Sequence, residues 1–118
     1  MHWLLFVAAL AVGVAAVGHA ITGERDTLKI VAAGSPGAID HVRTAWHLLT
    51  VLLMATAVVL AGLGHHGHDA GASLAGTHIA GGLGLGGLFV TWRTRGRNPT
   101  GFLLVVACLA AWLGATAH

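Results

Sequence analysis

The chain has 118 residues, of which 56% are hydrophobic and 8% charged, with a formal net charge of +2. Soluble domains carry roughly a quarter charged residues, so this composition excludes an ordinary water-soluble fold and leaves little mass for a catalytic module outside a membrane. The pI near 9.5 rests on only six Lys and Arg residues, which membrane orientation explains better than nucleic-acid binding does.

Four stretches without Asp, Glu, Lys or Arg make up most of the chain. A helix needs roughly 20 mainly apolar residues to cross the hydrocarbon core, because lipid offers no partner for backbone amides. The stretches predict a single all-α transmembrane domain over residues 1–118, an integral membrane four-helix bundle that runs up-down-up-down. Its predicted spans are residues 2–20, 44–63, 71–92 and 100–117.

The first predicted span competes with a cleaved signal peptide, because Gly18-His19-Ala20 resembles a small-residue cleavage site. The positively charged segment that opens such a peptide is missing, so we interpret the segment as a retained span. The loop that follows, residues 21–43, mixes charges with apolar side chains, which predicts a short helix lying on the inner membrane surface. Gly34-Ser35-Pro36-Gly37 predicts the turn back into the membrane.

The third predicted span is rich in glycine, which weakens a helix in water but allows close helix contact in lipid. Gly82 and Gly86 form the small-xxx-small step typical of such a contact. Because the last two loops are short, we expect the second and third spans, and the third and fourth, to be antiparallel neighbours. Cys108, the only cysteine, lies in the fourth span and is interpreted as a small buried hydrophobe.

The Lys and Arg side chains predict the direction of the spans. They occur in two predicted loops only, as Arg25, Lys29 and Arg43 in the first and Arg93, Arg95 and Arg97 in the third. The positive-inside rule places both loops in the cytoplasm. The sequence therefore predicts a multi-pass protein of the bacterial inner membrane with both termini on the non-cytoplasmic side.

Polar residues gather at the predicted inner ends of the first two spans. Arg43, His47 and Thr50 follow helical spacing on one face of the second span, and the topology brings His19 and Glu24 to the same depth. Such a group would suit a transition metal, a haem held by two imidazoles, or a proton relay. Alternatively, these side chains reach lipid headgroups and tie the loop to the helix ends. The full candidate group is His19, Glu24, Arg25, Arg43, Trp46, His47 and Thr50.

Two further histidine groups are candidates. His78 lies about two turns inside the third span, where a polar ring normally faces other helices or a cavity. The glycines near it form either a trough for a flat macrocycle with His78 as axial ligand, or a tight helix contact with His78 bonded to a carbonyl or hydroxyl. An outer tract suits Cu(II), Zn(II) or Ni(II), although exposed tracts of this kind also bind such ions weakly without function. Its residues are His65, His66, His68 and Asp69.

Gly18-His19, Gly23-Glu24-Arg25 and Trp46-His47 followed by Thr50 form a distinctive set over the first half of the chain. In these residues the chain resembles small four-span bacterial membrane proteins of unassigned function. The resemblance implies that the inner group is a shared feature of such proteins, and it implies no activity. In size and span number the chain is also similar to small multidrug exporters and fluoride channels, but it lacks the motifs of both.

The sequence favours a non-enzymatic membrane component, because it contains no Walker, nucleophile-elbow or His-Glu-x-x-His motif. The preferred hypothesis is a small protein that forms a homo-oligomer or joins other membrane subunits through small-residue faces. One alternative is a haem- or metal-binding redox protein that uses His19 and His47, or His78. The other is a small proton-linked transporter or channel, because imidazole changes protonation near neutral pH.

Overall fold

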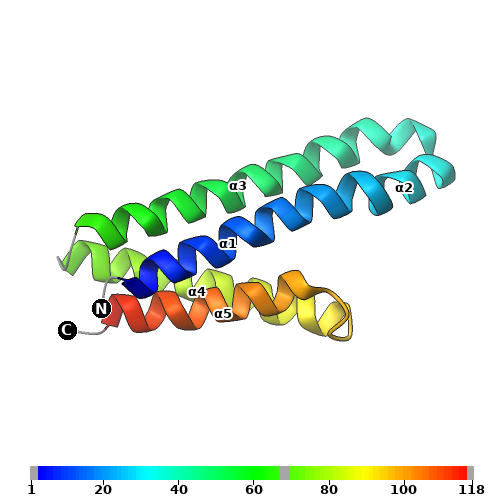
Figure 1. The fold of residues 1–118 in the computed structure, drawn as a ribbon. Helices are drawn as coiled ribbons and strands as arrows, with labels where there is room; N and C mark the ends of the chain where they lie inside the picture. Colours follow the sequence, from blue (N-terminus) through cyan, green and yellow to red (C-terminus); the bar gives the residue numbers. More distant parts are fainter. Residues whose placement is uncertain (1–2, 67–69, 117–118) are drawn as a thin grey trace.

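A computed structural model describes residues 3–66 and 70–116 of the chain. Every regular element within these ranges is helical, which confirms the all-α prediction for the described residues. The long helices run in alternating directions, so that the start of α1 and the end of α5 share one end of the molecule (Figure 1). The elements are α1 (Trp3–Thr22), the π-helical turn η1 (Gly23–Thr27), α2 (Leu28–Gly34), the 3₁₀ turn η2 (Pro36–Ala38), α3 (Ile39–His66), α4 (Ala70–Arg93) and α5 (Pro99–Thr116).

Four helical segments are long and apolar enough to cross a membrane. This confirms the prediction of four membrane-spanning helices by length and composition. The segments are Trp3–Gly34, Pro36–His65, Ala70–Arg93 and Pro99–Thr116. Two connections, between α2 and α3 and between α4 and α5, lie toward the same end of the molecule, which we call the arginine end because it carries every Lys and Arg.

The first loop does not fold as the sequence predicts. Through η1, α2 continues along the line of α1 (Figure 1). No proline or glycine interrupts residues 24–33, so the helix ends only where Gly34 and Pro36 stop it. Its 32 residues span about 48 Å, against a hydrocarbon core of about 30 Å. The hairpin that it forms with α3 therefore extends beyond the α4–α5 pair.

The helices pack in two pairs that meet along α1 and α5. α1 lies between α3 and α5, and α4 packs against α5 (Figure 1). The predicted pairing of the third and fourth spans is thus confirmed, whereas the predicted pairing of the second and third is wrong, because α3 and α4 touch very little. A short connection brings two helix ends together but does not make the helices pack along their length.

Small residues form the contact between α4 and α5. A Cβ added at Gly87 would lie 2.9 Å from the backbone N of Val105 and 3.0 Å from the carbonyl O of Gly101. A Cβ added at Gly76 would lie 2.8 Å from the Cβ of Ala115. These distances leave no room for a side chain, so the glycines let the two backbones approach closely, as is usual between helices in lipid.

Gly82 and Gly86, the small-xxx-small step predicted for a close helix contact, do not take part in the contact between α4 and α5. Nothing lies within 4 Å of a Cβ added at Gly82 or Gly86. The face of α4 that meets α5 is centred on Leu83 and Gly87, which are buried, and Gly82 lies about 100° around the helix from Leu83. Gly82 and Gly86 therefore face open space between α4 and α3.

Candidate functional site

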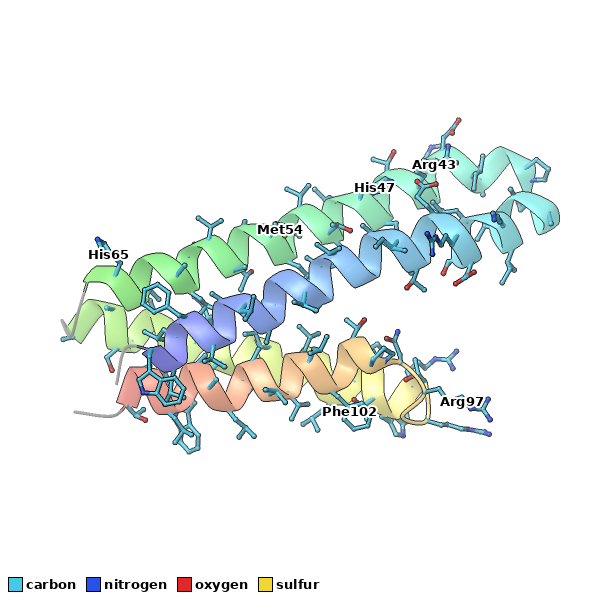
Figure 2. The ribbon with its side chains drawn as sticks, viewed as in Figure 1. Arg43, His47, Met54, His65, Arg97 and Phe102 are labelled. Carbon is cyan, nitrogen blue, oxygen red and sulfur yellow. The ribbon has the colours of Figure 1, made fainter. Side chains whose placement is uncertain are left out.

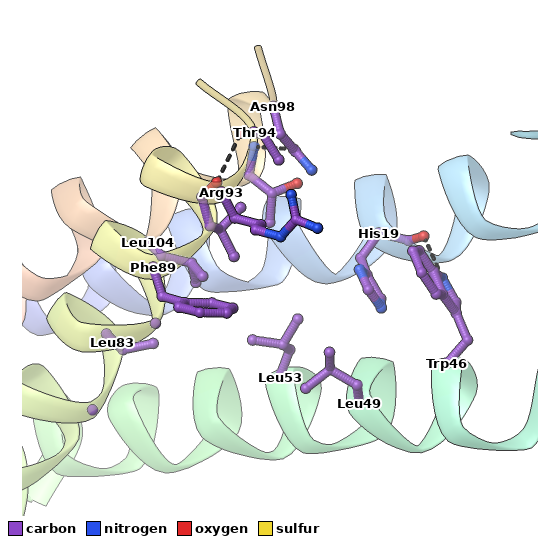
Figure 3. A pocket seen from close by; sticks show the side chains of 14 residues that line it. His19, Trp46, Leu49, Leu53, Leu83, Phe89, Arg93, Thr94, Asn98 and Leu104 are labelled. Carbon is purple, nitrogen blue, oxygen red and sulfur yellow. Dashed lines mark hydrogen bonds between the residues drawn. The ribbon is translucent and has the colours of Figure 1, made fainter. Parts of the chain in front are cut away.

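His19 and Trp46 join α1 to α3 near the arginine end. Their rings stack with centroids 4.1 Å apart and an interplanar angle of 3°. The Nε1–H of Trp46 also donates a hydrogen bond of 2.9 Å to the backbone carbonyl of His19 (Figure 3). The indole of Trp46 is thus held by both the ring and the backbone of one residue, which fixes the distance between the two helices at this level.

Gly23 makes this close approach possible. It is the buried residue of η1, and a Cβ at this position would overlap the indole of Trp46. The helix widens here, because the N–H of Leu28 bonds to the carbonyl of Gly23 five residues earlier. Single π turns of this kind occur frequently at functional sites. The structure thus gives a physical reason for Gly23 and Trp46 to occur together.

Glu24 connects η1 to the residues of α3 that flank Trp46. Its Oε1 lies 2.8 Å from Nε2 of His47 and 3.4 Å from Nε of Arg43. Figure 2 shows Arg43 and His47 on the same stretch of α3. All three side chains are about half exposed, so we expect these contacts to stabilise the fold by no more than about 1 kcal/mol. Glu24, Arg43 and His47 therefore form a polar cluster that is accessible from outside the protein.

Two other predicted members of the inner group have different positions. Thr50 Oγ1 donates to the carbonyl of Trp46 at 3.2 Å, one turn earlier on α3. Arg25 is exposed on η1, and among the described residues its guanidinium forms no ion pair. The structure therefore brings together His19 with Trp46, and Glu24 with Arg43 and His47. Thr50 bonds only within α3, and Arg25 lies at the edge.

His78 does not join this group. It is exposed on α4, where its Nδ1 lies 2.8 Å from the carbonyl O of Leu74 in the same helix. It lies 15 positions before Arg93, or about 22 Å along the axis of α4. The interpretation in which His78 bonds to a carbonyl agrees with this contact. The tight helix contact expected around it does not form, because Gly82 and Gly86 face open space.

The described residues contain no group of three or more His, Cys, Asp and Glu side chains that could hold a metal ion. His19 and His47 have different partners, since one stacks on Trp46 and the other meets Glu24. Of the predicted outer metal group, only the side chain of His65 is described, and it is exposed. His68, Asp69 and the side chain of His66 lie outside the described residues, so that site stays a prediction.

A cleft of about 520 Å³ opens between α3 and α4, where the two helix pairs diverge (Figure 3). Gly82 and Gly86 supply its floor on α4, because they carry no side chain. Its rim toward the arginine end is polar and includes Arg93, Thr94 and Asn98. The apolar walls come from three helices and include Leu49, Leu53, Leu83, Phe89, Val90 and Leu104.

His19 is the one imidazole that lines this cleft among the described residues. Its Nε2 is buried and has no hydrogen-bond partner. A buried polar atom without a partner costs about 1–3 kcal/mol. Sequence reasoning selected His19 by its depth but missed Arg93 as its counterpart across the cleft, because their proximity depends on how the helix pairs diverge.

Comparison with protein-family models, with curated proteins and with solved structures finds no match to this chain. The resemblance of its first half to small four-span bacterial proteins therefore stays a prediction.

Proposed function

We propose that this chain is a small non-enzymatic protein of the bacterial inner membrane that works by association, either with itself or as an accessory subunit of a larger membrane assembly. The observation that supports this proposal most directly is the open face of α3. This helix packs against α1 on one side, and α4 and α5 leave its opposite side uncovered. A second helix can therefore pack along α3 without displacing any described contact.

The open face of α3 has the spacing of a helix–helix seam. Lipid tails are as apolar as leucine, so an exposed apolar face alone does not drive association, and close packing must do so. A repeat of 3.5 residues keeps a stripe on one side of a helix, and small residues within it let a partner approach. Nothing lies within 4 Å of a Cβ added at Gly62. The seam follows alternating steps of three and four residues through Leu48, Val51, Ala55, Val58 and Gly62.

In the proposed orientation the arginine end lies in the cytoplasm and both termini lie on the non-cytoplasmic side. The positive-inside rule supports this orientation, since Lys and Arg side chains flank the connection between α2 and α3 and occupy the connection between α4 and α5. We expect a reporter fused after Gly96 to report the cytoplasm and one fused after His68 to report the periplasm. Reporters that place both positions in one compartment would contradict the orientation.

Cysteine cross-linking in native membranes tests the association. In a Cys108→Ser chain, we expect Val58→Cys to give a disulfide-linked dimer under mild oxidation, seen on non-reducing gels. Val106→Cys is the matched control, because it makes the same change on α5, away from the seam. Val58 and Val106 are 69% and 51% exposed, so exposure alone does not separate them.

A heavier adduct formed with another membrane protein at Val58 alone would support the accessory-subunit form of the proposal. Equal cross-linking from Val58→Cys and Val106→Cys would indicate random collisions and contradict it. So would the absence of cross-links from both positions together with a monomeric, partner-free particle on blue-native gels.

A further inference from the structure

We propose that the cleft between α3 and α4 binds one anionic phospholipid from the leaflet at the arginine end. Its phosphate lies at Arg93 and His19, and one acyl chain lies along the apolar walls. The proposal does not depend on the association of α3, because the seam through Val58 lies on the side of α3 away from the cleft.

The length and lining of the cleft suit an acyl chain. Its volume of about 520 Å³ falls within the roughly 300–1,000 Å³ of sites that bind small molecules. Along α4 it runs from Gly82 to Arg93, a separation of 11 positions or about 16 Å. One leaflet is half of a hydrocarbon core about 30 Å thick, so this length matches a single leaflet. Apolar side chains such as Leu53 and Phe89 line the same stretch (Figure 3).

The charge at the rim selects an anionic headgroup. Arg93 ends α4 at the mouth of the cleft and is exposed, and Arg95 and Arg97 follow it. Among the described residues, both ion pairs involve Glu24 on the other hairpin, so no carboxylate neutralises Arg93. A guanidinium binds phosphate through two parallel hydrogen bonds, which gives a phosphate at the rim a specific partner.

His19 supplies the second polar contact. It faces the cleft from α1 while Arg93 faces it from α4 (Figure 3). Nε2 of His19 is buried and has no partner in the protein. With the lipid bound, the ring would expose this atom, and a phosphate or ester oxygen at this depth would accept a hydrogen bond from its protonated form. A helix from a second copy would instead place apolar side chains against Nε2 of His19 and would leave Arg93 unpaired. The two polar groups therefore favour a lipid over a helix.

Native mass spectrometry of the full-length, delipidated protein tests the proposal by titration with phosphatidylglycerol and phosphatidylcholine. We expect one phosphatidylglycerol to bind at least about tenfold more tightly than phosphatidylcholine, because charge-assisted hydrogen bonds favour the anionic headgroup. Arg93→Gln is expected to weaken phosphatidylglycerol binding by about tenfold or more. Arg95→Gln is the matched control and is expected to weaken it by about fivefold at most, the effect of one surface charge.

A second pair of variants tests the apolar part of the cleft. Gly86→Leu places a side chain on its floor and is expected to weaken phosphatidylglycerol binding at least about tenfold. Gly81→Leu makes the same change on the adjacent exposed face of α4, which does not line the cleft, and is expected to leave the affinity unchanged. Circular dichroism checks that the helical content of each variant matches that of the wild type.

Three results would overturn the proposal. Equal losses of phosphatidylglycerol affinity in Arg93→Gln and Arg95→Gln would show that the binding depends only on general surface charge. Full binding in Gly86→Leu would place the lipid outside the cleft. A haem absorption band at one equivalent per chain, lost in His19→Ala, would show that the cleft holds a cofactor instead.

Discussion

Replacing Trp46 with alanine is expected to lower the free energy of unfolding by about 3 kcal/mol. This is at the lower end of the range for removing a tryptophan from a core, because Trp46 is only partly buried. The variant loses the stack on His19 and the hydrogen bond to its carbonyl, and it leaves a void beside Gly23. Unfolding in mixed micelles followed by circular dichroism measures the loss.

Two companion variants identify the source of that loss. Trp46→Phe keeps an aromatic ring but removes the Nε1–H donor, so we expect a loss of about 1 kcal/mol. Trp92→Ala removes an indole that is 76% exposed on α4, and we expect less than about 0.5 kcal/mol. If Trp46→Ala costs no more than Trp92→Ala, the contact between α1 and α3 does not depend on the indole of Trp46.

Gly23→Ala is expected to lower the free energy of unfolding by about 1–3 kcal/mol, although alanine is the better helix former. The added Cβ would occupy the position of the Trp46 indole, so either the ring or the helix must move. Gly18→Ala is the matched control on α1, since nothing lies within 4 Å of a Cβ there. We expect Gly18→Ala to be neutral or to stabilise the chain by up to about 1 kcal/mol.

The double variant Gly23→Ala/Trp46→Ala tests whether the two residues act on each other. Without the indole, the new methyl group has room, so the combined loss is expected to be smaller than the sum of the two single losses. A coupling of about 1 kcal/mol or more is typical of residues in contact. Strictly additive losses would show that Gly23 is required for some reason other than Trp46.

His19 and Trp46 link the two parts of the site. They hold α1 against α3, and they also line the cleft, whereas Glu24, Arg43 and His47 do not line it. The hairpin contact at His19 therefore sets the shape of the cleft wall that faces Arg93. A change at Trp46 is expected to alter both the stability of the first hairpin and the affinity of the cleft for a lipid.

The sequence alone determined how many helices are long and apolar enough to span a membrane, and which polar residues share a depth. Hydrocarbon excludes charges and unpaired amides, so charge-free runs mark the helices directly. His19, Glu24, Trp46 and His47 fall at matching positions along two antiparallel helices, and the structure brings them into contact. Their grouping was predictable because depth in a membrane follows from position in the sequence.

Only the tertiary structure decided which helix faces pack and where a cavity remains. In helices that are apolar all around, no hydrophobic stripe marks the packed face, so Gly82 and Gly86 look as suitable for a contact as Gly76 and Gly87 do. The choice depends on the shapes of facing side chains and on where the helix pairs diverge. For the same reason, the sequence did not show that Arg93 and His19 face one cleft, because their proximity arises from packing between helices.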